Sequence, residues 1–283
     1  MKAQPIDVWN IETFDAPLIR LLEAKAHVIQ GYMRADHDIF VAYDNYNGPD
    51  RPLLRPDNPY ATPFHALQEA MGEEMKSRIV RAFHYTRMTD AEIAILRRQG
   101  IHLCTLATLR ARLGALVAEG SLSASAADIL YNASPFHRDP LESRPNKFWM
   151  ASHPIAIDDT GVKPLMSRWG GEVSSMWMRD PDLLTQLASI GTARILELAV
   201  PLSATNHCYA AGKAVIATFG RSRGCIPDKH AFDLYAFKPL PPQVLLQIHT
   251  EGEQSFTNMG QSYPVGYVDV SIGRWKELTG EDY

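Results

Sequence analysis

The pattern of apolar and polar positions predicts helices mainly in the first half of the chain. Leu18, Leu21, Leu22 and Ala26 form one apolar face at helical spacing. Comparable patterns predict helices over residues 16–33, 64–77, 90–99, 106–119, 123–132 and 181–189. The first half of the chain is therefore expected to be largely helical.

Short runs rich in β-branched and aromatic residues predict strands, most of them in the second half. These runs cover residues 79–85, 101–103, 147–152, 194–201, 214–219, 232–237, 244–249 and 263–271. Because helices come first and strands follow, the order favours an α+β fold with mostly antiparallel strands over regular βαβ winding.

The N-terminal region differs from the rest of the chain. Prolines at positions 49, 52, 56, 59 and 63 prevent regular structure across much of residues 44–63. From Arg78 onward the strand and helix patterns become tighter. We therefore expect a helical, proline-rich subdomain over residues 1–78 and a main domain over residues 79–283.

Composition excludes several classes of function. The 28 basic and 32 acidic residues give a formal net charge of −4, which argues against nucleic-acid binding through the overall field but allows a local basic groove. Cys104, Cys208 and Cys225 are too few and too widely spaced for a disulfide framework or a zinc site. The scattered histidines predict no catalytic metal.

No apolar run approaches the roughly 20 residues that span a bilayer, and no signal peptide is evident. We therefore expect a cytoplasmic protein without membrane partners.

The strongest candidate chemistry lies where a predicted strand meets a capped helix. His84 is expected at the carboxyl end of the strand over residues 79–85. Thr89 and Glu92 match the capping-box pattern of a helix that begins at Asp90. This position would hold the imidazole on a rigid scaffold above a sheet edge.

Three polar neighbours extend the candidate site. Tyr85 and Thr86 supply hydroxyl groups and Arg87 supplies a fixed cation. Such a set suits an amide, a ribose diol and a pyrophosphate better than a metal. The structural alternative is that His84 only satisfies buried backbone groups and that Arg87 is a surface residue.

The run Phe-His-Tyr-Thr-Arg at residues 83–87, with Glu92-Ile93 and Gly100-Ile101 after it, resembles the opening of ADP-ribosyltransferase-fold enzymes. That family includes poly-ADP-ribose-polymerase-type enzymes and bacterial DNA-targeting toxins. The resemblance covers residues 79–103 well and residues 104–283 loosely, as helices followed by strands. It implies a split β core, NAD as substrate, and a position for His84 near the nicotinamide ribose.

The resemblance also implies an aromatic residue on the second core strand, against nicotinamide. This sequence has Phe148 and Trp149 there, whereas a tyrosine is usual in the family. We expect Trp149 to be the cofactor-binding residue and Phe148 to pack in the core.

A second chemical signal is Arg-Trp-Gly-Gly-Glu at residues 168–172. The two glycines allow close backbone approach to a ligand and leave Glu172 unshielded, and Trp169 can form a pocket wall. By the resemblance, Glu172 is the catalytic carboxylate, which holds a ribose hydroxyl and stabilises developing positive charge. The alternative is a helix N-terminus at which Glu172 complements the dipole.

Other charged residues compete for a role. Glu197 lies inside an apolar strand, where a carboxylate is costly unless it is paired or functional. Glu251 and Glu253 follow a late strand, where many members of the family keep the catalytic glutamate. Arg221 and Arg223 can hold phosphate or nucleic acid, although a solvated turn explains them equally simply.

The resemblance implies an NAD-dependent ADP-ribosyltransferase of the toxin or phage-defence type. It would move ADP-ribose from NAD to a nucleic-acid or protein acceptor and release nicotinamide. His84 would orient the ribose, Thr86 and Arg87 would assist with ribose or phosphate, and Trp169 would flank the nicotinamide. A toxin implies an antitoxin partner, for which the region over residues 1–78 is a candidate surface. The alternatives are a non-catalytic nucleotide- or protein-binding module and an NAD glycohydrolase.

Overall fold

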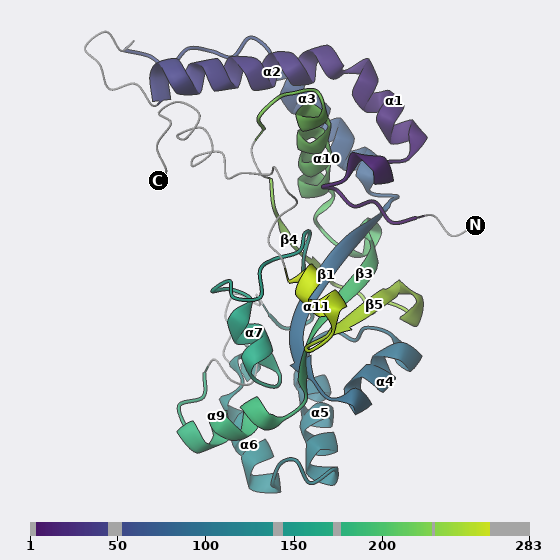
Figure 1. Cartoon of the computed structure of the whole chain (residues 1–283), viewed down its shortest axis with the longest axis vertical. Coiled ribbons are helices and arrows are strands. Elements are labelled where there is room, and N and C mark those ends of the chain that lie inside the picture. Colours follow the sequence, from purple (N-terminus) through teal and green to yellow (C-terminus); the bar gives the residue numbers. More distant parts are fainter. Residues whose placement is uncertain (1–3, 45–52, 138–143, 172–176, 228–229, 261–283) are drawn as a thin grey trace.

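The computed structural model describes residues 4–44, 53–137, 144–171, 177–227 and 230–260. Figure 1 shows a central sheet with α1–α3 and α10 at one end and α5, α6 and α9 at the other. The helices are α1 (Ala16–Ala24), α2 (Ala26–Ile39), α3 (Ala61–Met75), α4 (Asp90–Gln99), α5 (Leu106–Ala118), α6 (Ala124–Ala133), α7 (Lys163–Ser167), α9 (Pro181–Ser189), α10 (Cys208–Ser222) and α11 (Gln254–Met259). The strands are β1 (Ile79–Met88), β2 (Phe148–Ala151), β3 (Thr192–Pro201), β4 (Asp233–Ala236) and β5 (Leu245–Thr250). Helices and one sheet therefore form the α+β fold that the sequence predicts.

The five strands form one antiparallel sheet in the order β4-β2-β1-β3-β5. β1 and β3 pair along their whole length, from Ile79 opposite Pro201 to Met88 opposite Thr192. β1 and β2, in contrast, share one registered pair, Phe83 with Ala151. The sheet is therefore continuous on one side of β1 and interrupted on the other.

The two faces of β1 carry different side chains, because neighbouring residues of a strand point to opposite faces. We call one the His84 face; β1 contributes to it Val80, Ala82, His84, Thr86 and Met88. We call the other the Glu197 face; β1 contributes to it Arg81, Phe83, Tyr85 and Arg87, and Glu197 of β3 lies opposite Phe83.

The largest core joins the N-terminal helices, α10 and the His84 face of the sheet. Its members include Leu22, Met71 and Phe219 from the helices and Val80 and Leu198 from the strands. Ile6 also forms a parallel bridge with Val80. Residues on both sides of position 78 thus share one hydrophobic core, and the division of the chain there stays a prediction.

Two glycines allow α3 and α10 to cross closely. A Cβ atom on Gly212 would lie 2.8 Å from the backbone nitrogen of Gly72. Any larger side chain would therefore force the two helices apart.

Two smaller cores also lie within the described residues. One lies between α5, α6 and α9 and contains the fully buried Trp169. The other covers the Glu197 face, where Phe83 and Tyr85 pack against Met166 of α7 and Phe256 of α11.

The structure corrects several predicted elements. Residues 214–219 lie within α10 and are not a strand: the side chains from Ala214 to Phe219 are buried all round, and a short apolar run does not distinguish a buried strand from a buried helix. The helix predicted over residues 16–33 is two helices that meet at Lys25, whose φ of −113° and ψ of 10° interrupt the helical backbone. In the segment 101–103, Ile101 forms an isolated bridge to Leu240.

One further difference concerns the candidate site itself. β1 continues to Met88, so His84 lies in the middle of the strand and not at its carboxyl end. Pairing with β3 carries the strand through residues 86–88, which their polar sequence did not indicate. The strand predicted over residues 263–271 falls outside the described residues.

Candidate functional site

His84 lies where β1 and β2 separate. Its Nδ1 is 2.8 Å from the backbone oxygen of Trp149, one of the β2 residues that do not pair in register with β1. A carbonyl oxygen only accepts hydrogen bonds, so Nδ1 carries the proton and donates. In the neutral ring, Nε2 therefore keeps a lone pair that can accept a hydrogen bond from a ligand.

The surroundings of His84 keep its imidazole uncharged. The ring is partly buried and packs on Phe148, with the ring centroids 4.3 Å apart. Burial lowers the pKa of His84 to about 4; the hydrogen bond to Trp149 opposes this shift, and the positive charge of Arg112 adds to it. At neutral pH, His84 is therefore a hydrogen-bond acceptor and not a cation.

Glu92 connects this region to the end of β1. Its side chain completes the predicted capping box with Thr89. The same carboxylate accepts hydrogen bonds from Trp169 Nε1 at 2.9 Å and from Arg112 Nε at 2.7 Å. Arg112 in turn lies over the Trp169 ring, 4.6 Å from its centroid. The helix cap thereby also orients an arginine whose positive charge reaches His84.

The structure brings the two sequence motifs together. The backbone nitrogen of Gly170 lies 3.4 Å from the backbone oxygen of Arg87, so the glycine turn contacts the end of β1. Gly170 and Gly171 have φ values of 73° and 53°, a left-handed conformation that glycine adopts without strain. Glu172, the predicted catalytic carboxylate, lies outside the described residues.

The four polar residues at positions 84–87 divide between the two faces. His84 and Thr86 share one face, and Thr86 is buried. The Tyr85 hydroxyl on the other face accepts a hydrogen bond of 2.6 Å from the Ile155 backbone, and burial raises the pKa of Tyr85 to about 12. Arg87 donates to the Ile190 backbone oxygen. Tyr85 and Arg87 therefore do not share a face with the His84 imidazole.

The two predicted tryptophans differ in accessibility. Trp149 is 39% exposed, and its ring lies 4.7 Å from that of Tyr235. Trp169 has no exposed surface and belongs to a hydrophobic core. Trp169 contacts Glu92 and Arg112, so its ring faces these two residues and the core and not solvent.

The rival carboxylates lie away from the His84 imidazole. Glu197 pairs with Arg81 at 2.7 Å and with His249 at 3.2 Å on the opposite face. Glu251 lies 3.8 Å from Arg87, and Glu253 accepts a hydrogen bond from the Thr250 backbone nitrogen.

Sequence reasoning missed Arg112. Its position within an amphipathic helix gave no signal, because nothing in the local pattern links α5 to β1. Glu92 was recognised for its cap, but its contacts with residues at positions 112 and 169 depend on tertiary folding.

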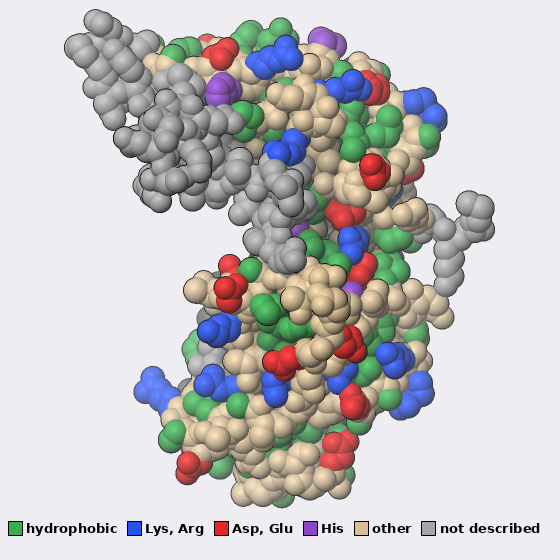
Figure 2. Space-filling view, viewed as in Figure 1, with side chains coloured by type: hydrophobic (Ala, Val, Ile, Leu, Met, Phe, Trp, Pro, Cys, Tyr) green, Lys and Arg blue, Asp and Glu red, His purple; other side chains and the backbone are tan. Residues whose placement is uncertain are grey.

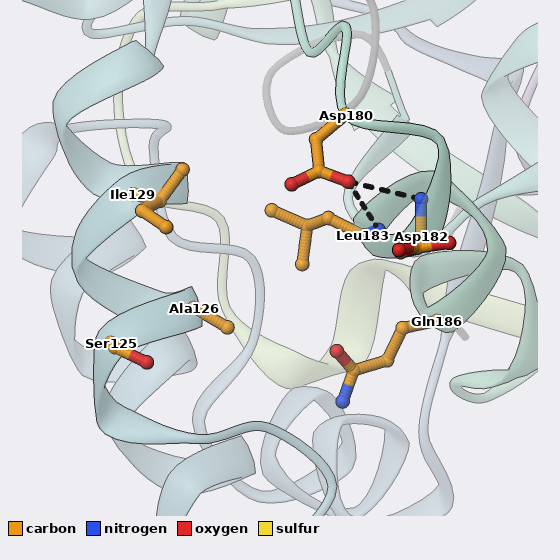
Figure 3. A pocket seen from close by; sticks show the side chains of 7 residues that line it. All are labelled: Ser125, Ala126, Ile129, Asp180, Asp182, Leu183 and Gln186. Carbon is orange, nitrogen blue, oxygen red and sulfur yellow. Dashed lines mark hydrogen bonds between the residues drawn. The ribbon is translucent and has the colours of Figure 1, made fainter.

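Two surface hollows lie elsewhere. Figure 3 shows the first, where Ala126 and Ile129 of α6 face Leu183 and Gln186 of α9, and Asp180 accepts hydrogen bonds from the start of α9. The second lies between α3 and the start of α10. Neither hollow is lined by a predicted site residue.

Among the described residues, no cluster of three or more His, Cys, Asp and Glu side chains is arranged to hold a metal ion. Likewise, no described helix is long and apolar enough to cross a membrane.

A scan against protein-family models, a search of curated proteins and a search of solved structures found no match to this chain. The case for function therefore depends on the site itself.

Proposed function

We propose that this protein is an NAD-dependent ADP-ribosyltransferase of the toxin or defence type, with NAD bound beside His84. The observation that carries the proposal is the interruption of the sheet between β1 and β2, where His84 donates to Trp149 and keeps Nε2 available. A ligand bound at this position would meet a hydrogen-bond acceptor that a rigid strand holds in place. The proximity of Gly170 to the same strand supports a single site built from both motifs.

The proposed reaction breaks the bond between the nicotinamide nitrogen and C1′ of the ribose. Nicotinamide leaves with the bonding electron pair, and positive charge develops on the ribose. Neutral His84 accepts a hydrogen bond from a ribose hydroxyl and fixes the sugar, because an uncharged Nε2 offers a lone pair at neutral pH. The carboxylate of Glu172 stabilises the positive charge. The acceptor nucleophile then bonds to C1′ and loses its proton to a base.

A nucleic-acid acceptor and a protein acceptor are both compatible with this chemistry. Figure 2 shows acidic and basic side chains interspersed over the lower half of the molecule, in keeping with the net charge of −4. Of the two arginines considered for phosphate binding, Arg223 forms an ion pair with Glu23. A toxin of this kind would be neutralised by an antitoxin, with residues 1–78 as the candidate surface.

The test is nicotinamide release from NAD by wild type, His84→Ala and Glu172→Ala, with and without added DNA, RNA or protein. His102→Ala is the matched control, because His102 is an exposed histidine whose ring contacts Gln99 and no predicted site residue. We expect both site variants to lose release and the control to retain it. Equal release by His84→Ala and wild type would contradict the proposal.

The same assay separates the alternatives. Free ADP-ribose as the sole product would indicate an NAD glycohydrolase. Binding of NAD without release would indicate a non-catalytic binding module. The binding module is the second candidate. Glu197 and Glu251 lie away from the His84 imidazole, so the proposed catalysis depends on Glu172 alone, and a site without that carboxylate would bind NAD without cleaving it.

A further inference from the structure

Only part of the hydrogen-bonding capacity of the Arg112 guanidinium is used. Nε donates to Glu92 Oε1, but no described residue accepts a hydrogen bond from Nη1 or Nη2. Nη2 is buried, whereas the Arg112 side chain as a whole keeps 35% of its surface exposed. The terminal nitrogens therefore have unused donor capacity, and another part of the same side chain borders solvent.

Glu92 is the one described carboxylate that pairs with Arg112, and it holds Nε and not the terminal nitrogens. The charge of Arg112 reaches His84 and Cys104. Neutral His84 and the Cys104 thiol, whose pKa is raised by burial, offer no negative charge at neutral pH. The other carboxylate oxygen of Glu92 accepts hydrogen bonds from the Trp169 indole and the Thr89 backbone nitrogen.

The orientation of Arg112 is fixed before any ligand arrives. Glu92 holds Nε, and the Trp169 ring supports the guanidinium plane at 4.6 Å from its centroid. A planar guanidinium with a fixed orientation matches the paired oxygens of a phosphate.

We propose that Arg112 binds a phosphate or pyrophosphate group of the ligand beside His84. The identification of that ligand as NAD rests on the proposed function, but the anion site does not depend on it. His84 would then contact the ribose while Arg112 contacts the adjoining pyrophosphate, and the two residues together would set the direction in which a dinucleotide lies.

The test compares Arg112→Gln with Arg110→Gln. Arg110 is a matched control on the same helix, because it also pairs with a carboxylate, Asp128, and lies over an aromatic ring, 4.0 Å from the Tyr131 centroid. The ligands are inorganic pyrophosphate, NAD and nicotinamide riboside, which lacks the pyrophosphate. We expect at least tenfold weaker binding of pyrophosphate and NAD by Arg112→Gln. We also expect changes below twofold for nicotinamide riboside, and for every ligand with Arg110→Gln.

A second readout follows the His84 ring by NMR. Because the positive charge of Arg112 lowers the pKa of His84, pyrophosphate bound to wild type should raise that pKa. Arg112→Gln should raise it without ligand, and Arg112→Lys, which keeps the charge, should leave it low. The wild-type experiment does not depend on the folding of any variant.

The outcomes separate the two proposals. Loss of pyrophosphate binding in Arg112→Gln, with no NAD binding by wild type, would support the anion site and refute the NAD-dependent function. Equal pyrophosphate affinity in wild type and Arg112→Gln, or no binding by wild type at millimolar pyrophosphate, would overturn the anion site, whatever the nicotinamide assay shows.

Discussion

The two faces of β1 carry polar clusters of opposite character. On the Glu197 face, both carboxylate oxygens of Glu197 are paired, one with Arg81 and one with His249, and Arg81 also pairs with Asp7 at 3.1 Å. On the His84 face, Nε2 of His84 keeps its lone pair, and Arg112 of α5, whose charge reaches His84, has unused donors. The His84 imidazole and the Glu197 ion pairs lie on opposite faces of the sheet.

The difference separates a structural role from a binding role. Buried charges that satisfy one another hold strands together and offer little to a ligand. Polar groups left without partners cost stability unless something else satisfies them. His249 Nδ1, which is buried without a partner among the described residues, is an exception on the Glu197 face. The comparison predicts that substitutions on the Glu197 face mainly affect stability, whereas those on the His84 face mainly affect ligand binding.

The largest expected effect is from Glu197→Ala. Removal of this carboxylate leaves Arg81 and His249 partly buried without their shared partner. The free energy of unfolding should fall by about 3 kcal/mol, as when one member of a buried ion pair is removed. Urea unfolding measures this change, and Glu251→Ala, which breaks a more exposed pair with Arg87, is the control. A loss below about 1 kcal/mol for Glu197→Ala would contradict a structural role.

The next effect concerns pH and His84→Asn. The pKa of His84 is about 4 in the folded protein and about 6.5 when unfolded. The unfolded chain therefore binds a proton first as pH falls, so the stability contributed by neutral His84 is complete above pH 6.5 and lost as pH falls toward 4. Wild type should lose about 1–2 kcal/mol more than His84→Asn between pH 7 and pH 5. Parallel pH dependence of urea unfolding in the two proteins would contradict the lowered pKa.

A smaller loss is expected from Tyr85→Phe. The substitution removes the acceptor of the Ile155 backbone N–H but keeps the ring in its core. Unfolding free energy should fall by about 1 kcal/mol, the usual net value of one such hydrogen bond. NAD binding should be unchanged, because the hydroxyl is on the face opposite the His84 imidazole. Weaker NAD binding at unchanged stability would place Tyr85 in the ligand site.

The smallest stability effect is expected from Arg112→Gln. Its ion pair with Glu92 is partly exposed, and Glu92 keeps its bonds to Trp169 and Thr89. The loss should stay below about 1 kcal/mol, because the glutamine amide can still donate a hydrogen bond to Glu92. Urea unfolding beside pyrophosphate titration measures both properties. A large stability loss with unchanged anion binding would make Arg112 a structural residue and reverse the comparison.

Local signals in the sequence predicted much of the fold. The capping box at Thr89 and Glu92 and the Pro181 start of α9 fix helix ends within a few residues, because backbone N–H groups at helix starts need nearby acceptors. The buried run over residues 214–219 was misassigned, because an apolar segment surrounded on all sides carries no periodic signal.

The candidate site was predictable only in part. The motif around His84 marked the strand. The motif around Gly170 marked a candidate site, and the structure places Gly170 against the Arg87 backbone of that strand. Strand alternation within the predicted strand over residues 79–85 already places Tyr85 and His84 on opposite faces. For Thr86 and Arg87 the same conclusion requires the continuation of β1 to Met88. The position of Arg112 depends on how α5 packs against α4 and Trp169, which no local pattern records.

The most direct test of the account is nicotinamide release by wild type, His84→Ala and Glu197→Gln, measured side by side below the unfolding temperature of each. Glu197→Gln keeps the shape of the side chain and removes the charge on the opposite face. The account predicts release by wild type and Glu197→Gln, and loss of release in His84→Ala. Release retained in His84→Ala but lost in folded Glu197→Gln would place the chemistry on the Glu197 face and contradict it.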